Sequence, residues 1–573
     1  MSLCACGQQP GRPLIHPVPF PPKPGLVVSL DVQTLVDSLS VGDKIAQLVI
    51  PWIPGTYAAD DDAGFARAEA WVDSLHIGGV IISAGSPLDI AAKLNHLQAG
   101  SGLPLLVASD FEGGTSIRLV GGTPFPPNMG IGATGSDSAA YEMGRITALE
   151  GRAVGVHLAL APVADVNNNP ANPIINTRSF GEDPATVGRF VAAEVRGLQE
   201  HGMLATAKHF PGHGDTGTDS HLALPVIAAD WRRLDSVELV PFRAAVAAGV
   251  KVVMSAHIAL PGIDVGQRRP GTVAPNILTG LLRDSLGFRG LVVTDALTMS
   301  GVARAYGAEA GVKAFLAGAD LLLQPGDPKA AIDAMASAVA RREITLERLD
   351  HSLRRVLEAK RSLGLFGNRL VRLDSVMSVV GSRPFQDAAR ATATRSVVLV
   401  KDAGGLVLGL ARSRPSMTVV TYAEEENRAA GNALAGELHA HGFAVTQVRL
   451  WPGSGRPSYD SAASAIARHP LALFATADRP TAGRGRIGLP PDLVALISAT
   501  ARERSTVLIS LGNPYIISQL PAVSSYLIGW ASNPITEEAV ARALAGVEPI
   551  TGRLPISIPP EFPRGWGIQR PAP

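Results

Sequence analysis

Cysteine is almost absent from the chain: among 573 residues there are two, Cys4 and Cys6, both at the extreme N-terminus. The body of the protein therefore has no disulfide bond and no thiolate metal site. An excess of charge is also missing, because 51 Lys and Arg face 50 Asp and Glu, for a net charge of +1. That balance argues against nucleic acid as a partner and against a polybasic membrane surface. No apolar run approaches the roughly 20 residues that span a bilayer, so no transmembrane segment is predicted.

Length and composition indicate a large enzyme with more than one domain. A chain of 573 residues is too long for one small domain, and a hydrophobic fraction of 46% is enough to fill sizeable cores. Glycine and proline are abundant, at 60 and 44 residues, but they are scattered between apolar runs. This distribution is typical of a loop-rich enzyme and not of a low-complexity chain.

The N-terminal segment is rich in proline and glycine, and we expect residues 1–28 to form a tether. Its residues Leu3–Gly7, LCACG, resemble the cleavage site of a bacterial lipoprotein. In that interpretation Cys6 carries lipid; in the alternative, the two cysteines are incidental. The sequence leaves the location of the protein open between the cytoplasm and lipid-anchored export.

Eight short apolar runs alternate with helical patterns between about residues 30 and 365. The runs are continuously apolar, as expected of parallel strands buried on both faces. Eight strand–helix units over this length predict a (β/α)8 barrel of the TIM type. A doubly wound sheet is the alternative, but no G-x-G-x-x-G follows the first strand. The predicted strands are 46–50, 79–82, 104–109, 156–161, 204–208, 251–255, 291–294 and 320–323.

A second α/β unit follows an amphipathic helix predicted over residues 345–363, which Gly364 ends. Six further apolar runs separated by helical stretches predict a smaller three-layer α/β/α sandwich with a mostly parallel sheet. We place the barrel domain at residues 29–375 and the sandwich at 376–573. The predicted strands are 396–400, 417–421, 443–449, 471–475, 506–511 and 526–530.

Polar side chains follow the barrel strands repeatedly. Since a barrel gathers the carboxyl ends of its strands on one face, we expect these side chains to share one site. A single polar residue there is readily explained as a loop cap, but five strands with such ends are not. The polar ends are 109–112, Asp165 with 167–169, Lys208 with His209, His257, and Asp295.

The densest segment is residues 208–221, KHFPGHGDTGTDSH, directly after a buried strand. Three interpretations are open. Its histidines and aspartates could hold a metal. Alternatively Asp219 could orient His221 for acid/base chemistry, since two residues apart in an extended segment they share a face. Finally, the segment could be a hydrogen-bonded structural loop. The first strand ends Val49-Ile50-Pro51 and not in the H-x-H of many barrel metallohydrolases, which weakens the metal interpretation.

Three more groups join the predicted site. Asp295 stands at the end of a buried strand, where a carboxylate is a nucleophile, a base or the cap of the next helix. Asp110 and Arg118, around a Gly-Gly turn, could grip a polar ligand from opposite sides. Arg178 offers a planar donor fork, or else a surface salt bridge with Glu182 or Asp183. Such a mixture suits a neutral, hydroxyl-rich ligand such as a sugar, and no phosphate-binding loop is present.

Four motifs together resemble glycoside hydrolase family 3, in particular its bacterial β-N-acetylglucosaminidases that process peptidoglycan fragments. The motifs are KHFPGHGDTGTDSH, NPIINTRSFGEDP, DFEGG with its following Arg, and VVTDAL. The stretches TRSVVLVKD, VLISLGNPY and GRLPISIP are similar to the second domain of the two-domain members. The resemblance implies a glycosidase that needs no metal and no organic cofactor.

The resemblance also assigns roles. Asp295 matches the nucleophile, and Asp219 with His221 matches a dyad in which histidine is the acid/base. Ala296 stands where several relatives have a second Asp, and this leaves the nucleophile intact. The residues that match sugar-hydroxyl contacts are Asp110, Arg178, Lys208 and His209, with Arg118 as a supporting contact.

The resemblance therefore implies a retaining exo-β-N-acetylglucosaminidase, a hydrolase acting on small carbohydrates. The alternatives are a β-glycoside phosphorylase or β-glucosidase of the same family, or an inactive sugar-binding protein. Because every candidate catalytic residue precedes residue 300, we expect the second domain not to be needed for the chemistry.

Overall fold

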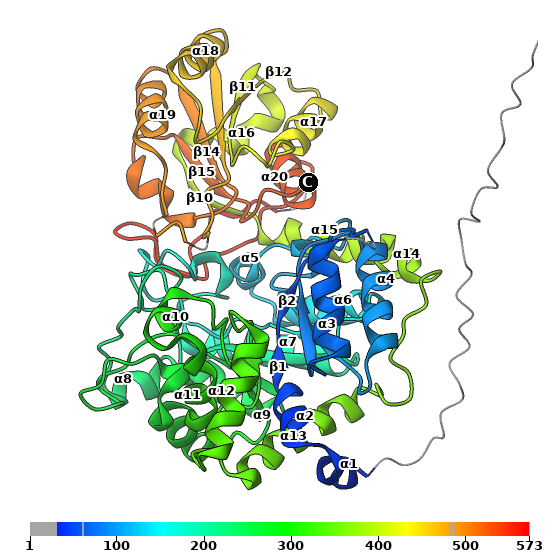
Figure 1. Cartoon of the computed structure of the whole chain (residues 1–573). Helices are drawn as coiled ribbons and strands as arrows, with labels where there is room; N and C mark the ends of the chain where they lie inside the picture. Colours follow the sequence, from blue (N-terminus) through cyan, green and yellow to red (C-terminus); the bar gives the residue numbers. More distant parts are fainter. Residues whose placement is uncertain (1–30, 60–61, 482, 486, 572–573) are drawn as a thin grey trace, which may run out of the picture.

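A computed structural model describes residues 31–571 except 60, 61, 482 and 486. The predicted tether and the predicted lipid anchor at Cys6 lie outside the described residues. The described chain folds into a barrel and a smaller α/β domain packed on one end of it (Figure 1). Within those residues, no helix combines the length and apolarity needed to cross a membrane.

The barrel closes through residues 49–53, which Pro51 divides into two short strands; the predicted strand 46–50 overlaps only the first of them. The first part, β1, pairs in parallel with β9, and the second part, β2, pairs with β3. The bridge between Val293 and Leu321 joins β8 to β9 and completes the ring. The TIM-type fold is confirmed. The strands are β1 Val49–Ile50, β2 Trp52–Ile53, β3 Gly79–Ile82, β4 Leu106–Ser109, β5 Leu158–Ala159, β6 Leu204–Phe210, β7 Val252–Ser255, β8 Leu291–Val293 and β9 Leu322–Leu323.

The barrel helices begin where the sequence supplies caps. Ser86, Asp183 and Asp327 each accept backbone N–H bonds at a helix start, and a proline follows each of them. The helices are α1 Val32–Ser38, α2 Val41–Ala46, α3 Ala63–Asp73, α4 Pro87–Gly100, α5 Asn128–Ala133, α6 Asp137–Ala153, α7 Pro184–Gln199, α8 Trp231–Ser236, α9 Leu239–Ala247, α10 Ser300–Tyr306, α11 Ala310–Ala317, α12 Pro328–Ala340 and α13 Leu346–Ser362, with a π-helical segment, Asn276–Ser285.

The second domain has a six-stranded sheet in the order β10-β15-β14-β13-β11-β12, in which only the β10–β15 pair is antiparallel. Alternate side chains point to opposite faces: Val419 packs with α17 and α20, whereas Val420 packs with α18 and α19. The predicted three-layer sandwich is confirmed. Its elements are β10 Val398–Asp402, α16 Leu406–Ser413, β11 Met417–Tyr422, α17 Asn432–Ala440, β12 Val445–Leu450, α18 Arg456–Ala467, β13 Leu471–Thr476, α19 Pro491–Glu503, β14 Ser505–Ser510, β15 Ser525–Ile528 and α20 Pro534–Ala545.

Two helices, α14 (Val376–Val379) and α15 (Arg383–Ser396), lead from the barrel to the sandwich. Helix α15 packs against α5 and α6 of the barrel and also against α20 of the second domain. The domain boundary between residues 375 and 376 stays a prediction.

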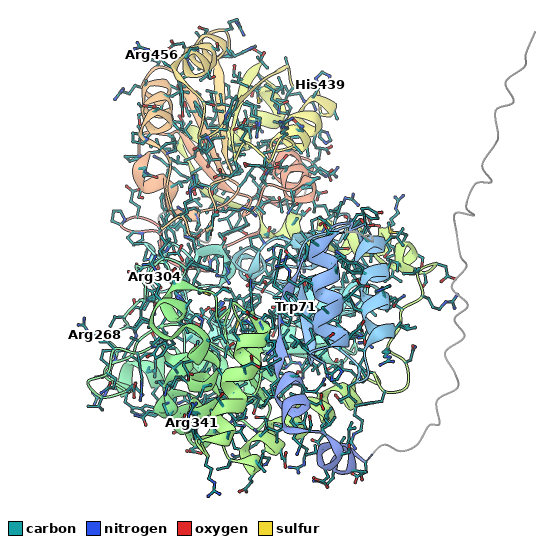
Figure 2. All side chains as sticks on the ribbon, viewed as in Figure 1. Trp71, Arg268, Arg304, Arg341, His439 and Arg456 are labelled. Atoms are coloured by element: carbon teal, nitrogen blue, oxygen red, sulfur yellow. The ribbon has the colours of Figure 1, made fainter. Side chains whose placement is uncertain are left out.

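The two domains meet where the strands of both sheets end. The side chain of Asn167, after β5, donates to the Tyr515 hydroxyl, after β14, at 2.9 Å. Asn176 donates to the Oδ1 atom of Asn513 at 3.3 Å. The carboxyl edge of the sandwich therefore faces the end of the barrel at which TIM-type enzymes carry their sites. Figure 2 shows the side chains of both domains meeting along this junction.

Candidate active site

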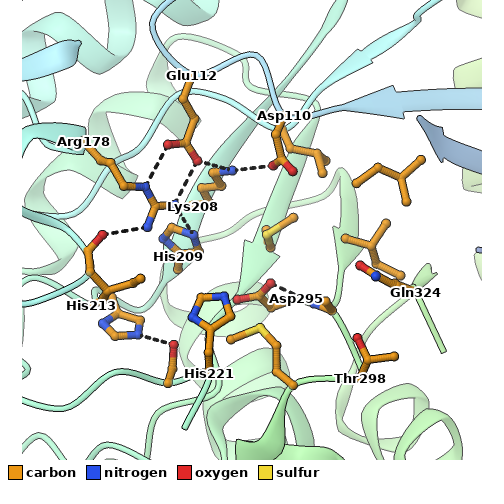
Figure 3. A pocket seen from close by; sticks show the side chains of 18 of the residues that line it. Asp110, Glu112, Arg178, Lys208, His209, His213, His221, Asp295, Thr298 and Gln324 are labelled. Atoms are coloured by element: carbon orange, nitrogen blue, oxygen red, sulfur yellow. Dashed lines mark hydrogen bonds and ion pairs between the residues drawn. The ribbon is translucent and has the colours of Figure 1, made fainter. Parts of the chain in front are cut away.

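A cavity of about 370 Å³ opens at the carboxyl ends of the barrel strands. It receives seven of the eight side chains predicted for the site, and Figure 3 shows most of them pointing into it. The eighth, Asp219, is buried directly behind His221. The seven are Asp110, Arg118, Arg178, Lys208, His209, His221 and Asp295.

Asp295 follows β8 and presents its carboxylate to the cavity (Figure 3). Burial raises the pKa of this carboxyl, but the imidazoles of His257 and His209 and the N–H of Ala296 outweigh burial, so the pKa is lowered. The Ala296 N–H donates to Oδ1 at 2.7 Å. Asp295 is therefore an ionised carboxylate with one oxygen held in place, as a nucleophile requires.

His221 also faces the cavity, and Asp219 holds it from behind. The Oδ1 atom of Asp219 accepts from the backbone N–H of His221 at 2.9 Å and pairs with its Nδ1 atom at 2.8 Å. Burial raises the pKa of Asp219, but these bonds and the His221 imidazole outweigh burial, so the pKa is lowered overall. An ionised carboxylate only accepts, so Nδ1 carries a proton and Nε2 is left for a substrate. This is the arrangement of an oriented acid/base histidine.

The loop 211–221, which carries this dyad, is tied down at its base. The amide of Asn172 donates to the carbonyls of His213 and Gly214 at 2.9 and 2.8 Å. Arg233 joins Asp215 on the loop to Glu238, at 3.2 and 2.9 Å. His213 contacts the Ser220 hydroxyl at 3.0 Å, and burial lowers its pKa to about 4. A neutral His213 therefore braces the loop.

Alternating charges form the opposite wall of the cavity. Arg178 donates two bonds to Glu112, at 2.8 and 2.9 Å, and Lys208 lies 2.6 Å from the same carboxylate. Lys208 also contacts Asp110 at 3.0 Å, and Arg118 pairs with Asp110 at 3.2 Å. The last pair corrects the expectation that Asp110 and Arg118 grip a ligand from opposite sides. Burial raises the pKa of Glu112, but the two cations hold it well below its usual value.

Arg178 does not form the surface salt bridge that was its alternative. Glu182 instead accepts from the backbone and hydroxyl of Ser557 in the second domain, at 2.8 and 2.7 Å. Asp183 caps α7 and pairs with Arg564. Glu182 and Asp183 therefore contact the second domain, whereas Arg178 lines the cavity.

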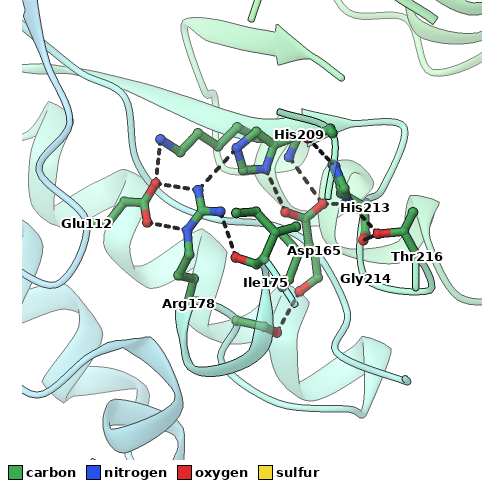
Figure 4. Close-up of polar contacts among 12 residues, drawn as sticks. Glu112, Asp165, Ile175, Arg178, His209, His213, Gly214 and Thr216 are labelled. Atoms are coloured by element: carbon green, nitrogen blue, oxygen red, sulfur yellow. Dashed lines mark hydrogen bonds and ion pairs between the residues drawn. The ribbon is translucent and has the colours of Figure 1, made fainter. Parts of the chain in front are cut away.

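Asp165 lies behind this wall and forms hydrogen bonds with His209 and His213 (Figure 4). Its fully buried carboxylate pairs with Nδ1 of His209 at 2.8 Å and accepts from the backbone N–H groups of His209 and His213 at 3.2 and 2.7 Å. Arg178 approaches Nε2 of His209 at 3.3 Å. Since a guanidinium only donates, Nε2 accepts and Nδ1 carries the proton, which leaves His209 a fixed part of the wall.

The structure does not bring the candidate metal ligands of residues 208–221 around one point. The side chains of the candidate ligands have separate partners: His209 contacts Asp165, His213 contacts Ser220 and Thr216, Asp215 contacts Arg233, and Asp219 contacts His221. Among residues 31–571 without the four gaps, no group of three or more His, Cys, Asp or Glu side chains could hold a metal ion.

Glu112 and Asp165 were expected at the site as polar strand ends, but the sequence assigned neither of them a role. Two further lining residues were missed. Gln324, after β9, and Pro480, from the loop between β13 and α19, also line the cavity. No sequence pattern indicates that Pro480 belongs here. Pro480 adds a residue of the second domain to the lining of the cavity, and the expectation that this domain is not needed for the chemistry stays a prediction.

The comparisons with known proteins identify the family of the chain. Residues 40–359 match the glycosyl hydrolase family 3 N terminal domain. The chain belongs to glycosyl hydrolase family 3. It is 32% identical, over 92% of its own length and 95% of the relative's, to a beta-N-acetylglucosaminidase/beta-glucosidase of Cellulomonas fimi.

Two solved structures have the same fold as this chain. A glycoside hydrolase family 3 beta-N-acetylglucosaminidase from Paenibacillus sp. has 32% identity and a TM-score of 0.82, covering 91% of this chain and 99% of that one. The beta-glucoside phosphorylase BglX has 27% identity and a TM-score of 0.82, covering 92% and 96%. Family 3 membership therefore extends over both domains.

Proposed function

We propose that the protein is a retaining exo-β-N-acetylglucosaminidase that hydrolyses terminal β-linked N-acetylglucosamine from small glycans such as peptidoglycan or chito-oligosaccharide fragments. The observation that carries the proposal is the pairing of Asp295 and His221 in one cavity, with the buried carboxylate of Asp219 on Nδ1 of His221. The relatives named above support the choice of sugar.

In the first step the ionised Asp295 attacks the anomeric carbon, the bond from that carbon to the glycosidic oxygen breaks, and Nε2 of protonated His221 gives its proton to the departing oxygen. The Asp219 carboxylate stabilises the imidazolium. In the second step neutral His221 takes a proton from water, the water oxygen attacks the same carbon, and the bond to Asp295 breaks. Two displacements at one carbon retain its configuration.

The charged wall supplies the sugar-binding groups. The carboxylates of Asp110 and Glu112 can accept from sugar hydroxyls, and Lys208 and Arg178 can donate to them. These four side chains also bind one another, so their positions are fixed before the sugar arrives. Pre-organised polar groups cost little to align on binding, and an analogue that leaves one unpaired is rejected.

The test is a panel of aryl β-glycosides that carry N-acetylglucosamine, glucose or xylose with the same leaving group. We expect the highest kcat/KM for the N-acetylglucosaminide and a β-configured initial product by NMR. A higher kcat/KM for the glucoside would overturn the choice of sugar and favour the β-glucosidase alternative. An active wild-type enzyme would exclude the inactive sugar-binding protein.

Phosphorolysis is the second candidate, and the likeness to a beta-glucoside phosphorylase favours testing it. An imidazole repels an incoming phosphate less than a carboxylate would. The same panel, run with and without inorganic phosphate, separates the two reactions. Hydrolysis predicts free sugar and an unchanged rate, whereas a rate that rises with phosphate and a sugar 1-phosphate product would identify a phosphorylase.

A further inference from the structure

The second domain reaches the acid/base dyad through one backbone group. The Oδ2 atom of Asp219 accepts from the N–H of Gly483 at 2.8 Å, across 264 positions of the chain. The other oxygen, Oδ1, accepts the two bonds from His221. The Asp219 side chain has no exposed surface. Both oxygens of the carboxylate that orients His221 are therefore held, one by its own loop and one by the other domain.

The loop that presents Gly483 joins β13 to α19, and several bonds fix it from outside the cavity. The carboxylate of Asp478 at its start accepts from the N–H of Gly488 at its end, at 2.8 Å. The Asp478 carbonyl accepts from the N–H of Asn513 at 2.6 Å. Arg484 pairs with Glu424, which follows β11, at 2.5 Å. The sheet of the second domain therefore determines where the Gly483 amide lies.

We propose that Gly483 is a positioning residue for the acid/base step: its amide N–H, supplied by the second domain, holds the Asp219 carboxylate in the rotamer that orients His221. This inference rests on the proposed role of His221. It also gives the second domain a part in the chemistry, in place of the expectation that the barrel acts alone.

The physical reason is the cost of an unpaired buried charge. Without the Gly483 donor, Oδ2 of Asp219 has no other hydrogen bond among the described residues, and the Asp219 side chain has no exposed surface. A carboxylate in that position rotates toward another donor or takes up a proton, and either change weakens its bond to Nδ1 of His221. The bond to Gly483 is among the contacts that keep the pKa of Asp219 low. Loss of the N–H should therefore resemble partial loss of Asp219.

The chain offers a matched pair of substitutions at one position. Gly483 has φ +77°, and no atom lies within 4 Å of the point that a Cβ atom would occupy, so Gly483→Ala keeps the N–H and adds only backbone strain. Gly483→Pro removes the N–H, and because its ring fixes φ near about −65° it also displaces the backbone at this position. The two variants therefore differ in backbone path as well as in the hydrogen bond, and the mutant cycle described below separates these two effects.

The assay compares two N-acetylglucosaminides, one with a dinitrophenolate leaving group, which needs no protonation, and one with a sugar leaving group, which does. For Gly483→Pro relative to Gly483→Ala we expect kcat/KM on the poor leaving group to fall about 10- to 100-fold, the range for a hydrogen bond to a charged group. Hydrolysis of the dinitrophenyl substrate should change less than about threefold.

A mutant cycle separates positioning from a general disturbance of the loop. In an Asp219→Ala background, the Pro and Ala variants should have equal rates on the disaccharide, because the hydrogen bond has no acceptor. Equal losses on both leaving groups, or a Pro effect that persists without Asp219, would overturn the proposal. Those outcomes differ from a failure of the proposed function, in which the wild type itself would not hydrolyse the N-acetylglucosaminides.

Discussion

Glu112 is the residue whose substitution tests the charged wall most directly. In Glu112→Gln one carboxylate oxygen becomes an NH₂ group, which faces Arg178 or Lys208, both of which only donate. Removing one partner from a buried ion pair costs about 3–5 kcal/mol. We expect the lower end, about 3 kcal/mol of unfolding free energy, because Arg178 keeps some solvent contact and Asp110 still balances Lys208.

Activity should fall with stability. A shifted Arg178 no longer presents its remaining donor to the sugar, so we expect kcat/KM for an aryl N-acetylglucosaminide to drop at least about 10-fold. Urea unfolding gives the stability, and initial rates at saturating and limiting substrate give kcat and KM. Glu142→Gln is the matched control: Glu142 also accepts two bonds from an arginine, Arg145, but on α6 and more exposed to solvent. Its loss should cost at most about 1 kcal/mol.

The pH dependence gives an independent check with a defined sign. Because the pKa of Glu112 is held well below its usual value of 4.5, its carboxylate stabilises the fold fully above that value. The contribution is lost as pH falls through the lower, folded-state pKa. The gap in stability between wild type and Glu112→Gln should therefore be constant above about pH 5 and shrink in stronger acid. A gap that grows in acid, or a variant as stable and active as wild type, would refute this account of the wall.

Other substitutions test the remaining assignments. His221→Gly should damage hydrolysis of a disaccharide far more than attack on a dinitrophenyl glycoside, and Asp219→Ala should give a milder form of that pattern; equal losses on both substrates would contradict the acid/base role. Asp295→Ala should lower both rates by at least about 10⁴-fold and prevent labelling by a fluorosugar, as read by intact-protein mass. Lys360 is fully buried, its partner is the neutral Gln47, and burial lowers its pKa from 10.5 to about 7. The destabilisation of the fold by the buried Lys360 charge is therefore complete below about pH 7 and declines toward pH 10.5. Lys360→Met should raise the free energy of unfolding by up to about 5 kcal/mol at pH 7 and by much less at pH 10. Urea titrations at both pH values measure the difference.

The sequence predicted the strands of both domains well, because most of them are continuous runs of apolar residues. Gly79–Ile82 is observed with the predicted bounds, and the predicted helix 345–363 is observed as α13, with Thr345 as its cap. The first predicted strand, 46–50, starts too early, because α2 runs to Ala46 and the paired residues begin at Val49.

The site was predictable to the extent that it follows strand ends. Asp110, Lys208, His209 and Asp295 gather in one cavity because the barrel brings their strands together. Which charge pairs with which was not predictable: Arg178 selects Glu112, 66 positions away, over the nearer Glu182. Such choices depend on tertiary packing, which no local pattern encodes.

The meeting of the two sheets at their carboxyl edges has a thermodynamic consequence. Asn167 and Asn176 hold the second domain to the barrel beside the cavity that takes the ligand. A ligand that contacts both domains binds the protein only when the two domains are packed together, in the docked form. Its binding free energy therefore stabilises the contact between the domains. At 100 times its Kd a ligand adds about 2.7 kcal/mol in this way. Saturating N-acetylglucosamine should then raise the unfolding temperature of both domains together, and proteolysis between α13 and α15 should slow as the ligand occupies the docked form.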